Sequence, residues 1–182
     1  MRQPIVDYNY LSELTGRVTP LDDDCGLLCG KICCRPDPKN SLGVYLFPGE
    51  ESRFAENEPW HTREYHNPGE YDFPGNWQEP VHFLKCTAPC PRDRRPMACR
   101  LFPLAPHLLT DGTLLLIHET ARLPYKCPLI TRNIPLRRDF IDTVALAWQM
   151  LLKDPRIYSL VDEDSREREK SIGSIPPIIW AE

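Results

Sequence analysis

The chain has 182 residues, 41% of them hydrophobic, and a formal net charge of −4 at pH 7. A chain of this length buries roughly 70% of its unfolded surface, so we expect one soluble domain over residues 1–182 that needs no disulfide staples. The acidic balance gives no attraction to nucleic acid or to an acidic membrane, and no apolar run approaches the roughly 18 residues of a membrane helix.

The amino-terminal segment predicts two helices and no export signal. Residues 5–14 favour a short helix, and TPLDDDCGLLCGKICC over residues 19–34 favours a second, because Thr19 can cap it and Pro20 suits the first helical position. The opening string MRQPIVDYNYLSEL lacks the apolar run of a signal peptide, so we expect the cytoplasm as the compartment of this chain.

Four cysteines fall within ten residues of the second predicted helix: Cys25, Cys29, Cys33 and Cys34. If the helix persists, the first three lie at i, i+4 and i+8 on one face, and the fourth lies about a quarter-turn away. Gly26 and Gly30 weaken a helix by up to about 1 kcal/mol each, so a loop-like segment that also presents ligands is the alternative.

The next segment predicts one strand and a long loop. Residues 44–47 favour a strand that ends in a Pro-Gly turn, and the aromatic-rich residues 53–80 show little periodicity, so we expect an ordered loop there. His61 and His66 have no short spacing to a cysteine, and we interpret both as surface or hydrogen-bonded histidines and not as ligands.

A second group of cysteines begins at the end of a predicted strand over residues 81–85. Cys86 lies at the end of this strand, and Cys90 and Cys99 follow. Four arginines crowd this segment: Arg92, Arg94, Arg95 and Arg100. Such a run is typical of a solvated face or of a phosphate-binding patch. Since a tetrathiolate zinc site or an oxidised [4Fe–4S] cluster carries about −2, we favour charge compensation of a metal centre over anion binding.

The carboxy-terminal third predicts a hairpin and helices. Asp111-Gly112 supplies two turn residues with positive φ between apolar flanks, and Cys127 follows close enough to return toward the hairpin. Residues 136–170 show helical periodicity that is broken at Asp154-Pro155. The closing SIPPIIWAE is a strap across the domain or an exposed partner-binding tail, and we favour the strap. The whole pattern predicts an α+β fold with a cysteine-bearing amino-terminal helix, a small antiparallel sheet and a carboxy-terminal helical cap.

The even number of cysteines, eight, also suits a disulfide framework. Against this, no export signal is present, and adjacent Cys33 and Cys34 cannot comfortably bridge to each other. We therefore expect metal ligation within a cysteine-rich core over residues 19–130. Zinc and a [4Fe–4S] cluster each take four thiolates, so eight cysteines suffice for two zinc sites, for one cluster with four bystanders, or for a di-metal centre.

Several strings resemble one known family. CGLLCGKICC, GVYLFPGE, FLKC, RRPMACRLFPLAP and KCPL occur in this order over about residues 25–130 and are similar to the YkgJ-type zinc- or iron-chelating domains, which carry a CxxCxxCC motif. The resemblance implies a metal- or cluster-binding protein of bacterial type. The first motif is spaced three and three here, and CPRDRRP replaces a tyrosine-containing string, so the choice between Cys33 and Cys34 stays open.

Two other classes of function remain alongside metal binding. Flagellin lysine N-methylase is similar in its cysteine arrangement, which implies an iron–sulfur-dependent redox or methyl-transfer enzyme. Such an enzyme needs a polar cavity beside the metal, and we expect the arginines of RDRRP or Glu50 to face that cavity. No GxSxG, Walker, GxGxxG or HExxH string supports another enzyme class. A protein-interaction module that docks a partner through its carboxy-terminal helix and tail is the third candidate.

Overall fold

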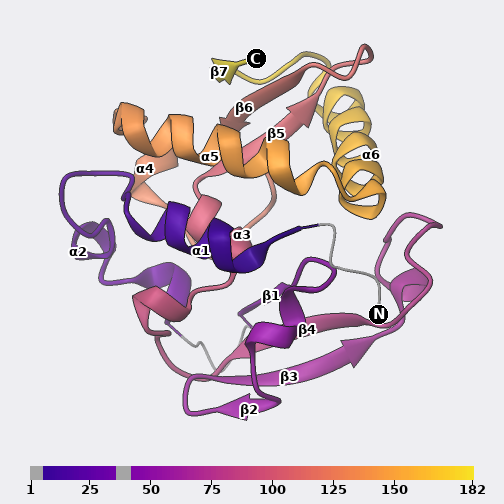
Figure 1. Ribbon diagram of the computed structural model, residues 1–182. Coiled ribbons are helices and arrows are strands. Elements are labelled where there is room, and N and C mark those ends of the chain that lie inside the picture. The colour runs from indigo at the N-terminus through magenta and orange to yellow at the C-terminus, as the bar shows by residue number, and fades with distance from the viewer. Residues whose placement is uncertain (1–5, 36–41) are drawn as a thin grey trace.

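The computed structural model of the protein describes residues 6–35 and 42–182. It combines helices with two antiparallel sheets, which confirms the predicted α+β fold. Figure 1 shows the three-stranded sheet with the long carboxy-terminal helices at one end of the molecule, the four-stranded sheet at the other, and α1 (Tyr8–Gly16) between them. Asp7 caps α1 through hydrogen bonds to two backbone N–H groups, so the helix starts later than predicted; Ile5 lies outside the described residues.

The four-stranded sheet has the order β1-β4-β3-β2. Its strands are β1 (Gly43–Tyr45), β2 (Asn57–Glu58), β3 (His61–His66) and β4 (Val81–Cys86), with short 3-10 turns η2 (Glu50–Arg53) and η3 (Pro68–Glu70) between them. The prediction of a loop over residues 53–80 was wrong for β2 and β3. All six residues of β3 pair with β4, so long-range pairing makes a strand where the local pattern shows no alternation.

The three-stranded sheet has the order β5-β6-β7 and contains the predicted hairpin. Its strands are β5 (Leu104–Leu108), β6 (Leu114–His118) and β7 (Ile178–Ala181). Of the two turn residues only Gly112 has a positive φ, +87°, so the expected pair of positive φ values was wrong. The tail pairs with β6 as β7, which is the strap that the sequence favours.

The main core lies between this sheet and the helices. The predicted helical region consists of α5 (Arg138–Leu151) and α6 (Pro155–Ile172), separated at Asp154, whose carboxylate accepts from the Arg156 N–H. Leu11, Leu116 and Leu151 are fully buried there, and each contributes about 1.5–3 kcal/mol of burial free energy. No helix of residues 6–35 and 42–182 has both the length and the apolarity to cross a membrane.

The cysteine segment is not the continuous helix that the sequence favours over residues 19–34. It consists of α2 (Gly26–Cys29), which ends at Gly30 with φ +61°, and the 3-10 turn η1 (Ile32–Cys34). Lys31 also has a positive φ, +60°, and two consecutive left-handed residues end an α-helix. The loop-like alternative is therefore the one observed. Three further short elements complete the fold: η4 (Arg92–Arg94), α3 (Met97–Leu101) and α4 (Pro128–Thr131).

Candidate metal centre

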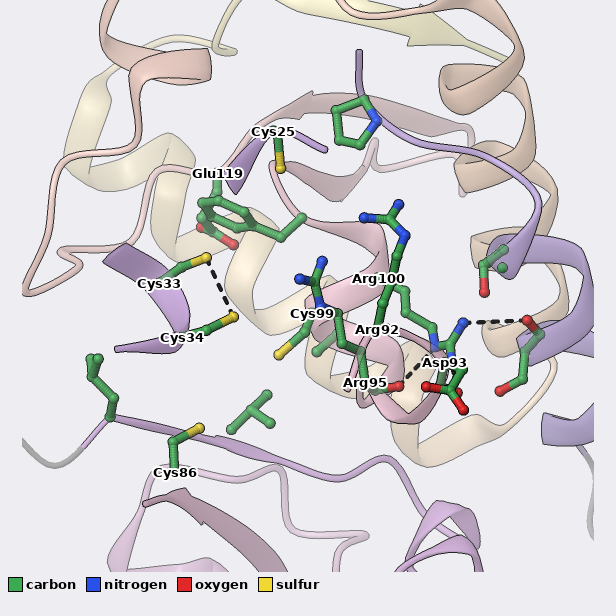
Figure 2. Close-up of a pocket in the computed structure, with 18 of the residues that line it drawn as sticks. Cys25, Cys33, Cys34, Cys86, Arg92, Asp93, Arg95, Cys99, Arg100 and Glu119 are labelled. Carbon is green, nitrogen blue, oxygen red and sulfur yellow. Dashed lines mark hydrogen bonds between the residues drawn. The ribbon is translucent and has the colours of Figure 1, made fainter. Parts of the chain in front are cut away.

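Four cysteines from separate parts of the chain form what we call the inner group: Cys34, Cys86, Cys90 and Cys99. Cys34 ends η1, Cys86 ends β4 as predicted, Cys90 lies in the loop before η4, and Cys99 lies on α3. Figure 2 shows the side chains of Cys34, Cys86 and Cys99 pointing into one space. The Cys34 and Cys90 thiols lie close to each other. The structure therefore brings the two cysteine runs of the sequence together.

Burial and mutual proximity hold the inner group in its neutral thiol form. The contact with Cys33, together with burial, raises the pKa of Cys34 to about 11, and burial followed by the nearby Cys90 raises the pKa of Cys86 to about 11. Burial and then the three other sulfurs of the group raise the pKa of Cys99 well above its ordinary value. Because thiolates so crowded repel one another, a bound cation would be needed to deprotonate them at neutral pH.

The remaining four cysteines form the outer group: Cys25, Cys29, Cys33 and Cys127. All four border one small cavity of about 30 Å³ between α2, η1 and α4, which Cys34 of the inner group also borders. Burial is the main cause that raises the pKa of Cys25, and the nearby Cys127 and Cys29 contribute. The Cys33 and Cys34 Sγ atoms are 3.8 Å apart, so the outer group adjoins the inner group. All eight cysteines are free thiols.

One of the four clustered arginines, Arg95, lies close to the sulfurs. Arg95 lies close to Cys90 and Cys34, and it also lies near Cys25 and Asp24. Its Nε is buried and has no hydrogen-bond partner.

The other three arginines have protein partners. Arg94 forms an ion pair with Glu58, and Arg92 lies 3.5 Å from a carboxylate oxygen of Asp24. Arg100 donates to the backbone carbonyls of three residues: Ser12, Asp93 and Arg95. Only Arg95 is therefore placed to offset negative charge on the sulfurs directly.

A cavity of about 650 Å³, which we call the main cavity, opens beside the cysteines (Figure 2). Cysteines of both groups line one wall, and Arg92 and Arg95 line it as well, while apolar side chains such as Val18 and Phe102 cover much of the rest. Burial and then the neighbouring sulfurs raise the pKa of Tyr125, which also borders it. This volume and this mixture of apolar walls with a few polar groups are typical of a small-molecule site.

Of the two alternatives expected beside the metal in an enzyme, Arg92 and Arg95 of RDRRP line the main cavity and Glu50 does not. Its side chain is 2% exposed and accepts hydrogen bonds from the backbone N–H groups of Phe47 (3.1 Å) and Met97 (2.6 Å). Since Met97 begins α3, this carboxylate fixes the helix that carries Cys99. Burial raises the pKa of Glu50 to about 7.

The two histidines of β3 have different environments. His66 fits its interpretation as a hydrogen-bonded residue, because its Nδ1 lies 2.8 Å from the Tyr45 hydroxyl. The interpretation of His61 was wrong: it is fully buried beside Trp60 and both of its ring nitrogens lack a partner. The register places it opposite Cys86. Only long-range strand pairing buries it, so no local signal in the sequence could have revealed it.

The chemistry of the donors fits a thiophilic metal, although the side chains are not yet in ligating positions. Within residues 6–35 and 42–182, no three histidine, cysteine, aspartate or glutamate side chains are grouped closely enough to hold an ion. Zinc needs four sulfurs at about 2.3 Å, so ligation requires rotation of the cysteine side chains. Four free thiols, a buried setting and an adjacent guanidinium are the components that such a centre uses.

Comparisons with known proteins add no relative: no family model, no curated protein and no solved structure matches this chain.

Proposed function

We propose that this protein binds a zinc ion or a [4Fe–4S] cluster through cysteine thiolates. The observation that carries the proposal is the inner group, in which four free thiols from η1, β4, the following loop and α3 gather beside Arg95. Zinc and [4Fe–4S] clusters take four thiolates each, and a nearby cation offsets their charge of about −2. When bound, the metal joins segments that are far apart in the sequence, which stabilises the folded state.

We also propose that the chain is a YkgJ-type metal-chelating protein of the cytoplasm. In support, four strings of the resemblance each supply at least one cysteine to the two groups: CGLLCGKICC, FLKC, RRPMACRLFPLAP and KCPL. Eight free thiols suit a reducing compartment. The resemblance carries metal binding but no reaction.

The test is metal analysis with an absorption spectrum on protein purified without oxygen. A brown sample rich in iron and sulfide identifies the cluster, and a colourless sample with stoichiometric zinc identifies the zinc site. Cys90→Ser is expected to lose metal and to lower the free energy of unfolding, whereas Thr87→Ser, a change at an exposed residue next to β4, keeps both. Full metal content in both Cys29→Ser and Cys90→Ser would refute the proposal.

The main cavity favours a second candidate, an iron–sulfur enzyme for redox or methyl-transfer chemistry. A structural zinc site is closed by its four ligands, whereas here about 650 Å³ of space adjoins the sulfurs, with Arg92 and Arg95 on its wall. The measurement is the electron paramagnetic resonance spectrum of the reduced, cluster-loaded protein with and without S-adenosylmethionine. A changed spectrum supports an enzyme with an accessible cluster, and an unchanged spectrum argues against methyl transfer from this donor.

A further inference from the structure

We propose that the chain holds two separate four-thiolate centres, one in the inner group (Cys34, Cys86, Cys90 and Cys99) and one in the outer group (Cys25, Cys29, Cys33 and Cys127). This inference rests on the proposed metal binding and specifies its stoichiometry. It also assigns each cysteine, including the adjacent pair, to one centre.

The outer group surrounds a small cavity, which Cys34 and Arg95 also border. Its four cysteines come from the residue before α2, the end of α2, η1 and the residue that caps α4, and all four border the cavity of about 30 Å³. That volume suffices for one ion-sized guest. Because α2 and α4 are each four residues long, ligation by these cysteines would add to the apolar contacts of Leu28, Ile32 and Leu129 around this cavity.

The inner group is complete without the outer one. Cys99 lies near each of the other three inner sulfurs, Cys86 lies near Cys90, and Cys90 lies close to Cys34. No outer cysteine is needed to reach the four ligands of one zinc ion or one cluster. A single centre would therefore leave the whole outer group as four free thiols around an ion-sized space.

The two groups meet at adjacent residues, with Arg95 beside them. Cys33 and Cys34 have sulfurs 3.8 Å apart and belong to different groups, so the 3-10 turn η1 serves both centres. Arg95 lies near Cys90 and Cys34 in the inner group and near Cys25 in the outer group. Two centres of about −2 each would repel one another, and a shared guanidinium between them reduces this cost.

The experiment is quantitative metal analysis of the purified protein and of one variant for each centre. We expect two centres per chain in the unmodified protein, loss of half of the metal in Cys90→Ser, and loss of the other half in Cys127→Ser. Thr87→Ser is the matched control and keeps both centres. Cys29→Ser is a second variant of the outer group, and it leaves the core intact because the neighbouring Leu27 and Leu28 are 75% and 48% exposed. Circular dichroism checks the fold of each variant.

The outcomes separate this inference from the proposed function. One centre in the unmodified protein, with full metal content in both Cys127→Ser and Cys29→Ser, overturns the two-centre arrangement and leaves metal binding standing. Complete loss of metal from a correctly folded Cys127→Ser also overturns it, because the inner group would then depend on an outer ligand. No metal in the unmodified protein refutes the proposed function itself.

Discussion

Burial of the Glu50 carboxyl makes the stability of the fold depend on pH. In the folded state its pKa rises from 4.5 to about 7, mainly because burial disfavours the charged form, while two N–H donors and the nearby Arg53 and Arg100 act in the opposite direction. Between these two values the folded protein keeps a proton that the unfolded chain has released. Unfolding then releases a proton, so raising the pH lowers the free energy of unfolding. One pKa unit corresponds to about 1.4 kcal/mol, so the full contribution is about 3 kcal/mol, lost between about pH 5 and pH 8.

The Glu50→Gln substitution isolates this effect. The Phe47 and Met97 N–H groups bond different carboxylate oxygens, and an amide offers only one oxygen, so one buried N–H loses its acceptor at a cost of about 1–3 kcal/mol. We expect Glu50→Gln to be less stable than the unmodified protein at pH 5 and to approach it at pH 8, measured by urea unfolding across this range. Glu163→Gln, at an exposed helix position, is the control that keeps the pH dependence. A difference that stays constant from pH 5 to pH 8 would show that the carboxyl does not titrate in this way.

Three further substitutions test other parts of the structure. His61→Leu removes two buried nitrogens without partners, so we expect urea unfolding to show a free energy of unfolding about 1–3 kcal/mol higher. A lower free energy of unfolding, or a loss of metal, would mean that the imidazole has a partner in the metal-loaded protein. Arg95→Gln removes the guanidinium beside the sulfurs, and we expect roughly tenfold faster transfer of metal to a chelator, as for other residues that surround metal ligands. Arg94→Gln is the control and leaves this rate unchanged, because Arg94 pairs with Glu58. Trp180→Ala removes a half-buried ring of β7 that packs against the main core, and we expect a loss of about 2–3 kcal/mol by thermal or urea unfolding.

Elements with a strong local signal could be predicted from the sequence. Asp154-Pro155 separates two helices because the carboxylate accepts a first-turn N–H and proline has no N–H to lose there. Gly112 ends the hairpin turn because it takes a positive φ without steric cost. The apolar stripe of α5 is buried as its periodicity predicts.

Elements that depend on distant partners could not be predicted. β3 is a strand because β4 pairs with it, although its own residues, HTREYH, show no apolar alternation. The same pairing buries His61. Among four clustered arginines, the sequence does not show that Arg95 lies beside the sulfurs while Arg94 forms an ion pair with Glu58, because these partners come from other segments.

The grouping of the cysteines depends on such distant contacts as well. In the sequence, the first run ends with Cys34, and Cys127 stands alone at the end. In space, Cys34 keeps its contact with Cys33 and also lies close to the later cysteines, whereas Cys127 joins the first ones. The left-handed residues Gly30 and Lys31 explain part of this arrangement, since they end α2 and start a new turn in which Cys34 is buried. A helix that continued through Gly30 would place Cys29 and Cys33 on one face and would carry them to a centre together. Because the chain turns at Gly30, η1 presents its two adjacent cysteines to two groups, and this turn is the local cause of the two-centre arrangement that we propose.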